Sequence, residues 1–272
     1  MKLGVSSYAF GWGVGLPDHT PAVPFTEIDL LGFARAHGLD LVQIGDHLPL
    51  HAFPEARLAR LQEAAAADQP VELEIGARGL TDAHLNKFIN LAHRLRSPLL
   101  RFVIDGPGFE PDASEVIASI RTALPLLEDA RVVLGIENHD RFPARTLRRM
   151  MEEINSPWVG ICLDTANSLG AGEGLEQVLG ELARHTVNLH VKDFAIRRVH
   201  SAMGFVVEGR PAGRGQLDLP RLLRRVAREQ RCRSVILEIW TPPEPELAQT
   251  ITKERLWAEA SIAYLKPLFV HS

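Results

Sequence analysis

The stretch that decides the fold runs from residue 132 to residue 164 and reads VVLGIENHDRFPARTLRRMMEEINSPWVGICLD. It contains two short apolar runs, each ending in a carboxylate, Glu137 and Asp164. Leu, Ala and Arg recur at helical spacing between the two runs. Runs that are apolar on both faces are typical of parallel strands covered by helices. The stretch therefore predicts a strand, a crossover helix and a second parallel strand.

The same alternation continues along the whole chain. The runs expected as strands are residues 2–6, 40–44, 72–76, 98–104, 132–137, 159–164, 187–191 and 234–239. Eight strands alternating with eight helices predict an α/β fold, a (β/α)8 TIM barrel in which residues 1–272 form a single domain. An open doubly wound sheet is the rival fold. It would usually have fewer strands and a glycine-rich first turn, which the sequence lacks.

Bulk composition restricts the class of protein. The chain has 272 residues, 46% of them hydrophobic, a formal net charge of −4 and a pI near 6.3, so electrostatic binding to nucleic acid is not expected. The two cysteines, Cys162 and Cys232, form no disulfide framework, which fits a reducing compartment. The chain runs from Met1 straight into a strand pattern and contains no apolar run of membrane length. We expect a cytoplasmic protein without a membrane partner.

Two long connections break the regular alternation. Residues 9–27 follow the first strand and are rich in Gly, Pro and aromatics, and residues 192–216 follow the seventh and are rich in Arg and Gly. Both follow strands, so both are expected at the mouth of the barrel. Long loops without secondary structure inside a compact domain are usually functional.

Four polar residues end four successive apolar runs: Glu137, Asp164, His190 and Glu238. In a closed parallel barrel these strand ends converge on one mouth. Taken singly, each has an ordinary alternative role as a solvated loop residue or a helix cap, and Asp164 is a reasonable cap. Together, three carboxylates and one imidazole are a ligand set for a divalent cation with open positions for substrate.

The segments IEN (136–138), LDT (163–165), LHVKD (189–193) and LE (237–238) resemble the xylose-isomerase-like superfamily of sugar isomerases and epimerases, which also includes AP endonucleases. The resemblance covers the eight-strand layout and is densest between Glu137 and Glu238. It implies that Glu137, Asp164, His190 and Glu238 bind a metal. It also implies that Glu137 and Glu238 act as the acid/base pair in epimerases.

The ligand types indicate the chemistry. A divalent cation that chelates a carbonyl and a neighbouring hydroxyl stabilises an enediolate as a Lewis acid. Carboxylates on the two faces of that intermediate can remove and return a proton. Mn²⁺ is the expected ion because one ligand is an imidazole, and Mg²⁺ and Co²⁺ are alternatives.

Further residues of the expected mouth are candidates for catalysis or substrate binding. Lys192 and His139 each lie two residues past a ligand and are candidate proton carriers, although both also fit exposed loop positions. Asp193 is expected to orient Lys192 or a loop arginine. Asn138 and Asn167 are candidate hydroxyl binders, with caps or turns as alternatives.

An anionic or highly hydroxylated substrate is expected. Arg214 lies between two glycines in the basic connection after the seventh strand, and an arginine fork matches a carboxylate. The other candidate substrate contacts are His47, Arg101 and Trp12, and an aromatic such as Trp12 fits either a wall over a sugar or ordinary core.

The leading functional prediction is a metal-dependent enzyme that acts through an enediolate on a small keto sugar or oxo sugar acid, as an isomerase or epimerase. A lyase on the same metal site is the alternative, either a decarboxylase or a dehydratase, with an oxo sugar acid such as 3-oxo-isoapionate as substrate. An AP endonuclease is a remote alternative, since Asn167 occupies the place of a histidine that this branch needs. A sugar-binding barrel without activity is the remaining class. Family analogy alone suggests a homo-oligomer.

Overall fold

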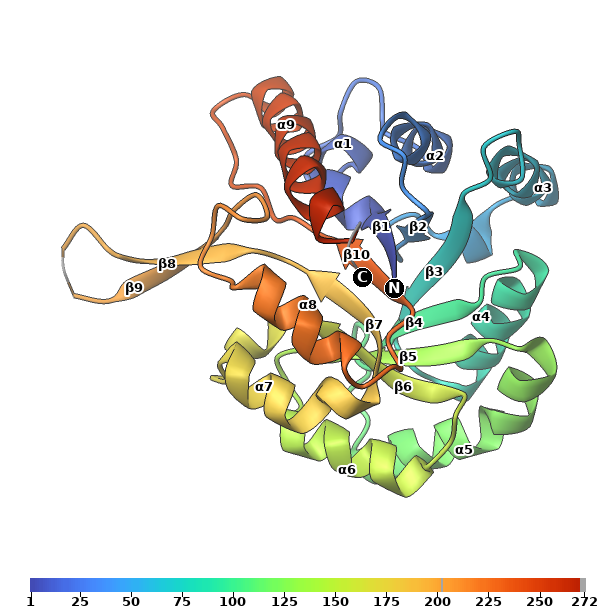
Figure 1. Ribbon diagram of the computed structural model, residues 1–272. Coiled ribbons are helices and arrows are strands. Elements are labelled where there is room, and N and C mark those ends of the chain that lie inside the picture. The colour runs from blue at the N-terminus through green and yellow to red at the C-terminus, as the bar shows by residue number, and fades with distance from the viewer. Residues whose placement is uncertain (202, 270–272) are drawn as a thin grey trace.

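Eight parallel strands close into a barrel in the order β1-β10-β7-β6-β5-β4-β3-β2 (Figure 1). The computed structural model describes residues 1–201 and 203–269. The barrel strands are β1 (Lys2–Ser6), β2 (Leu41–Ile44), β3 (Glu72–Arg78), β4 (Leu99–Val103), β5 (Val133–Glu137), β6 (Val159–Asp164), β7 (Thr186–Val191) and β10 (Ser234–Leu237). The predicted fold is confirmed, and each predicted strand matches an observed one to within two residues at either end. Residue 202 and residues 270–272, which fall within the predicted connection and the predicted domain, lie outside the described residues.

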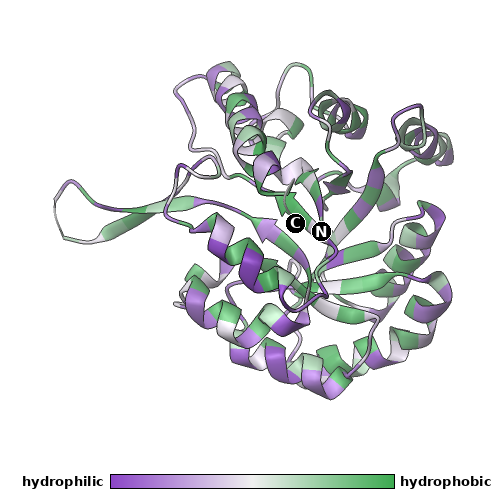
Figure 2. Ribbon diagram, viewed as in Figure 1, coloured by the Kyte–Doolittle hydropathy of each residue, from purple (hydrophilic) through white to green (hydrophobic). Residues whose placement is uncertain are grey.

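Helices form a ring around the barrel (Figure 1). They are α1 (Gly11–Val14), α2 (Glu27–Ala36), α3 (Glu55–Ala65), α4 (Asp82–Arg94), α5 (Ala113–Ala130), α6 (Ala144–Ile154), α7 (Leu175–Leu182), α8 (Leu219–Ala227) and α9 (Leu247–Leu265). Short 3₁₀ turns are η1 (Ser7–Phe10), η2 (Leu50–Ala52), η3 (Asn167–Leu169), η4 (Ala183–His185) and η5 (Lys266–Leu268). Figure 2 shows apolar colouring along the barrel strands and hydrophilic colouring on the outward side of the helices, as expected when each helix buries one face on the sheet.

Side-chain caps fix where several helices begin. Asp112 accepts a hydrogen bond from the backbone N–H of Glu115, and the Glu115 side chain accepts one from the backbone of Asp112 at the start of α5. Asp218 caps α8 by accepting from the backbone N–H of Arg221, with Pro220 in the first turn. Both starts lie directly after the strand-end loops that they fix in place.

Strand register brings the predicted ligands to adjacent levels of the barrel. Glu137 on β5 pairs with Cys162 on β6, and Asp164 on β6 pairs with His190 on β7. A register shift between Ile161 and Cys162 interrupts the β6–β7 ladder just before these residues. Since alternate side chains of a strand face the same side, Cys162 and Asp164 both face the barrel interior, one layer apart.

The connection after β7 is not the loop that the sequence predicted. It contains an antiparallel hairpin of β8 (Phe194–Arg198) and β9 (Phe205–Gly209), which projects away from the barrel as an arm, residues 194–209 (Figure 1). The alternating pattern of such a short hairpin was hidden among arginines and glycines. The connection after β1 likewise contains η1 and α1.

A single buried carboxylate holds the base of the arm. Asp193 accepts hydrogen bonds from the backbone N–H groups of Phe194, Gly213, Gly215 and Leu217, at 2.9 to 3.2 Å. The expectation that Asp193 orients Lys192 or an arginine is therefore wrong, because the carboxylate is used by backbone donors. A Cβ atom at Gly215 would overlap the Asp193 carboxylate, so glycine is required there by space.

Candidate metal centre

The four predicted ligands meet at the mouth end of the barrel. His190 Nδ1 lies 3.4 Å from Glu238 Oε1, 3.9 Å from Asp164 Oδ2 and 4.0 Å from Glu137 Oε2. All four side chains are buried, His190 completely. Such separations suit ligand atoms arranged around a shared cation, at about 2.0–2.2 Å from each to the ion.

Each of the four residues has one buried atom without a hydrogen-bond partner. Within the described part of the chain these atoms are Glu137 Oε2, Asp164 Oδ2, His190 Nδ1 and Glu238 Oε1. Glu137 Oε2 and Asp164 Oδ2 also lie in ion pairs with Arg101 and Lys192, whereas His190 Nδ1 and Glu238 Oε1 face one another without a donor between them. Buried acceptor atoms that converge without a shared donor are costly, so the arrangement favours a cation among them. The donor set, three carboxylate oxygens and one imidazole nitrogen, fits a divalent cation.

A glutamine from β2 fixes which histidine nitrogen faces the centre. His190 Nε2 lies 2.7 Å from Gln43 Oε1, while Gln43 Nε2 donates to Glu74 Oε2 at 3.0 Å and to Asn188 Oδ1 at 3.2 Å. Because both amide protons of Gln43 are used, its oxygen accepts, and the proton of the neutral imidazole resides on Nε2. His190 Nδ1 therefore presents a lone pair to the centre, as a metal ligand must.

Gln43 belongs to a polar network beneath the centre. Glu74 accepts hydrogen bonds from Ser234 Oγ at 2.6 Å, from Gln43 and from Asn188 Nδ2 at 3.3 Å. Burial raises the pKa of Glu74 to about 7, although the hydrogen bonds from Ser234 and Gln43 oppose that rise. The network holds Gln43, and through it His190, in one orientation.

Two cations, the half-buried Lys192 and the buried Arg101, lie directly against the carboxylates. Lys192 Nζ is 2.9 Å from Asp164 Oδ2 and 3.0 Å from Glu238 Oε2, and Arg101 forms ion pairs with Glu137 and with Asp46. Burial alone would lower the pKa of Lys192, but the carboxylates of Asp164, Glu238 and Glu137 outweigh it and raise that pKa, so Lys192 is an ammonium ion.

The same cations act on Glu238. Burial alone would raise the pKa of Glu238, but the positive charges of Lys192 and Arg101 outweigh it and lower that pKa. Glu238 is therefore held as a carboxylate, in hydrogen-bonding range of an ammonium ion.

The two predicted asparagines differ in role. Asn138 is buried and its side chain accepts from Asp164 N and donates to Asp164 O and Ser168 Oγ, so no polar atom of that side chain remains for a substrate. Asn167 donates to Glu137 Oε1 at 2.7 Å and receives a hydrogen bond from Lys192 Nζ at 3.3 Å. Asn167 is therefore part of the centre, whereas Asn138 holds the strand end that positions Asp164.

A polar group from the segments that follow the first two strands continues the mouth beyond Arg101. Asp46 accepts hydrogen bonds from Tyr8 Oη at 2.9 Å and from Arg101 Nη1 at 3.1 Å. The His47 ring lies 4.1 Å from the Tyr8 ring, and both of its nitrogens are buried without a hydrogen-bond partner of good geometry. Burial lowers the pKa of His47, so its imidazole is neutral and offers one donor and one acceptor.

Three other predicted contacts lie farther out. His139 pairs with Asp140 at 2.5 Å on the rim. Arg214 is exposed, its neighbours Ala212 and Gly213 contact α9 at Ser261 and Tyr264, and no contact joins its side chain to the centre among the described residues.

Trp12 faces a separate hollow of about 460 Å³ beside the mouth, which also includes Tyr8 and Trp240. Its indole N–H donates to the backbone carbonyl of Thr241 at 2.9 Å. Trp12 therefore borders the mouth without reaching the four ligands.

Sequence reasoning missed the support beneath the centre, namely Gln43, Glu74, Asn188 and Ser234. The available signal was polar residues inside otherwise apolar strands, since buried polar side chains in a strand interior need partners. Arg101 in β4 carried the same signal, and it was predicted to bind substrate but pairs with Glu137.

A centre of carboxylates and an imidazole in the mouth of a closed eight-strand barrel defines a class of metal-dependent TIM-barrel enzymes. A family model described as xylose isomerase-like TIM barrel matches residues 31–268. The chain belongs to this family.

Relatives with known names extend the comparison. The chain is 31% identical over 265 residues to the 3-oxo-isoapionate decarboxylase of Pectobacterium atrosepticum, covering 97% of this chain and 95% of that protein. A D-psicose 3-epimerase from Clostridium cellulolyticum H10, solved with D-tagatose, is similar with a TM-score of 0.73 and 13% identity, over 98% and 97% of the two chains. A xylose isomerase-like TIM barrel protein from Mycobacterium smegmatis, solved with magnesium, gives a TM-score of 0.70 and 12% identity over 97% of each chain.

At these identities the structural matches concern the fold alone. The family and the named relative support an enzyme, and the ligand set supports a divalent metal. No helix within the described residues has the length and apolar character needed to cross a membrane.

Proposed function

We propose that this chain is a divalent-metal-dependent lyase that decarboxylates a small 3-oxo sugar acid. The observation that carries the proposal is the pairing of Lys192 and Arg101 with the three carboxylates. The carboxylates and the two cations together carry one negative charge, and a bound dication would change this to one positive charge. A centre with that charge attracts a carboxylate substrate and stabilises an enolate.

The residues favour decarboxylation over proton abstraction. When bound, a divalent cation would act as a Lewis acid on the keto oxygen. Loss of CO₂ breaks a carbon–carbon bond and leaves its electron pair on the enolate, so no base has to remove a proton. Glu238, whose pKa is lowered, is a weak base in this arrangement, and Glu137 is paired with Arg101, whereas the Lys192 ammonium can return a proton to carbon.

The groups beyond Arg101 suit a hydroxylated substrate. His47 offers a donor and an acceptor that have no partner of good geometry, and Asn167 lies between Glu137 and Lys192. We propose that these two side chains bind substrate hydroxyl groups and that Mn²⁺ is the resident ion, with Mg²⁺ and Co²⁺ as alternatives. The 31% identity to a 3-oxo-isoapionate decarboxylase supports the same substrate class.

An isomerase or epimerase is the second candidate, because solved structures of sugar epimerases share the fold. That reaction needs Glu137 and Glu238 as free bases, one on each face of the substrate. Arg101 and Lys192 would have to withdraw from them first.

The test is a screen of metal-loaded protein against 3-oxo sugar acids and neutral ketoses in D₂O. Metal-dependent CO₂ release, lost in Asp164→Asn and kept in the rim variant Asp140→Asn, is expected. Deuterium uptake by a neutral ketose without CO₂ would replace the lyase with the second candidate. Bound metal without either reaction would overturn both.

A further inference from the structure

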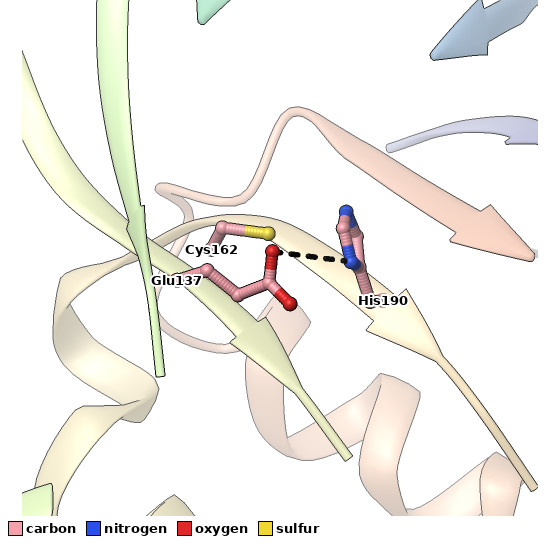
Figure 3. A group of neighbouring side chains, drawn as sticks. All are labelled: Glu137, Cys162 and His190. Carbon is pink, nitrogen blue, oxygen red and sulfur yellow. Dashed lines mark ion pairs between the residues drawn. The ribbon is translucent and has the colours of Figure 1, made fainter. Parts of the chain in front are cut away.

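A cysteine lies inside the barrel one layer below the metal centre. Cys162 is completely buried on β6, two residues before Asp164, and its sulfur points toward the space between Glu137 and His190 (Figure 3). Its thiol donates to Asn188 Oδ1 at 2.9 Å. The proposed lyase reaction gives this thiol no role.

Two overlapping groups of ligand atoms are present. Cys162, Glu137 and His190 each offer one atom within 4.8 Å of the others, and so do Asp164, His190 and Glu238. His190 Nδ1 is buried without a hydrogen-bond partner, and Glu137 Oε2 is held by its ion pair with Arg101, so one ligand atom beside the thiol lacks a partner. The lower group therefore consists of sulfur, oxygen and nitrogen, whereas the upper group has only oxygen and nitrogen.

We propose that Glu137, Cys162 and His190 form a second cation position, selective for thiophilic divalent ions such as Zn²⁺ and Cd²⁺. Thiolate sulfur and imidazole nitrogen are preferred by Zn²⁺, whereas Mg²⁺ and Mn²⁺ prefer oxygen. Binding at this position releases the thiol proton of Cys162 to solvent and forms a metal–sulfur bond. The position rests on the proposed function only in sharing His190 and Glu137 with the four-ligand centre.

Because the two positions share His190, they cannot both be occupied at the same time. Gln43 occupies His190 Nε2, so Nδ1 is the single imidazole nitrogen available to an ion. An ion bound beside Cys162 therefore takes His190 and Glu137 from the four-ligand set and leaves Asp164 and Glu238 without them. Zn²⁺ is expected to compete with the working ion and to lower activity through this lower position.

The experiment is a Co²⁺ titration followed by absorption spectroscopy. Co²⁺ accepts both ligand types, and a bound thiolate adds a near-ultraviolet sulfur-to-metal charge-transfer band to the visible d–d bands. The band is expected in the wild type, lost in Cys162→Ser and kept in Cys232→Ser. Cys232 is the matched control because it is the second of two cysteines in the chain and lies outside the centre.

The outcomes separate this inference from the proposed function. Visible d–d bands without a charge-transfer band in the wild type would overturn the second position and leave the upper centre intact. No Co²⁺ binding at all would overturn both. If Cys162→Ser does not fold, a wild-type band that persists in Cys232→Ser still assigns the sulfur to Cys162.

Affinity gives a second measurement. Cys162→Ser is expected to weaken Zn²⁺ binding by about tenfold or more and to leave Mn²⁺ binding within about twofold, because only the thiophilic ion uses sulfur. An equal loss of affinity for Zn²⁺ and Mn²⁺ would indicate a general distortion of the centre and would overturn the proposed selectivity for thiophilic ions.

Discussion

Gln43 Oε1 lies 2.7 Å from His190 Nε2, and this contact decides which nitrogen of the imidazole is free for a metal. Gln43→Leu removes the acceptor and is expected to weaken Mn²⁺ binding roughly 10–100-fold, as loss of an outer partner of a metal ligand typically does. Isothermal titration calorimetry measures the effect. Gln177→Leu is the matched control, because Gln177 lies on α7, away from the centre, where its side chain donates to Glu173. Unchanged affinity in Gln43→Leu would contradict the positioning role.

Lys192 and a metal ion compete for the same carboxylates. Lys192→Met removes an ammonium that is 2.9 Å from Asp164 and 3.0 Å from Glu238, so Mn²⁺ affinity is expected to rise while kcat falls by roughly 10²–10⁴-fold. Titration calorimetry and single-turnover assays test the two effects separately. Lys253→Met, which breaks a surface pair with Glu244, should change neither quantity. A fall in both affinity and kcat would instead mean that Lys192 mainly supports the structure.

The raised pKa of Glu74 predicts how the stability of the protein depends on pH. Its pKa is about 7 in the folded protein because of burial and near 4.5 in the unfolded chain, so the folded state binds more protons between these values. The free energy of unfolding of the metal-free protein should therefore fall as pH rises from about 4.5 through 7, by on the order of 3 kcal/mol. Urea unfolding at pH 5 and pH 8 measures it.

Glu74→Gln should flatten that dependence, since the amide does not titrate. The exposed Glu110→Gln makes the same chemical change and should leave the dependence as in the wild type. A slope of unchanged size in Glu74→Gln would assign the effect to another group.

Substitution of Asp193 should lower the stability of the protein more than most substitutions outside the centre. Asp193→Ala leaves the backbone N–H groups of Phe194, Gly213, Gly215 and Leu217 without their acceptor, and a loss of about 2–4 kcal/mol in the free energy of unfolding is expected. Hydrogen exchange should rise in residues 210–217 first. Asp29→Ala, which removes the exposed carboxylate that accepts from the N-cap Thr26 of α2, should cost less, and an equal loss in both would contradict the importance of burial at Asp193.

The sequence predicted the barrel and its four converging strand ends because each is a local signal, an apolar run followed by one polar residue. Gln43 and Glu74 could not be placed this way. A single polar residue inside a strand does not say which of seven other strands supplies its partner, and here Asn188 and Ser234 come from more than 100 residues away. The arm was missed because its cross-strand pairs, such as Ile196 with Val207, are set by a turn that the composition did not indicate.

The hydrogen bonds around Asp193 also make the arm structurally independent of the barrel. Arg210 N donates to Asp193 O at 2.9 Å and Gln216 N to Phe194 O at 2.8 Å, so the chain enters and leaves the arm at one fixed point. The segment beyond that point can lengthen, shorten or be exchanged between homologues while the strand ends keep their geometry. The arm is therefore a replaceable segment. Natural selection, or a designer who grafts a new hairpin, can alter the surroundings of the mouth through it and leave the four candidate ligands unchanged.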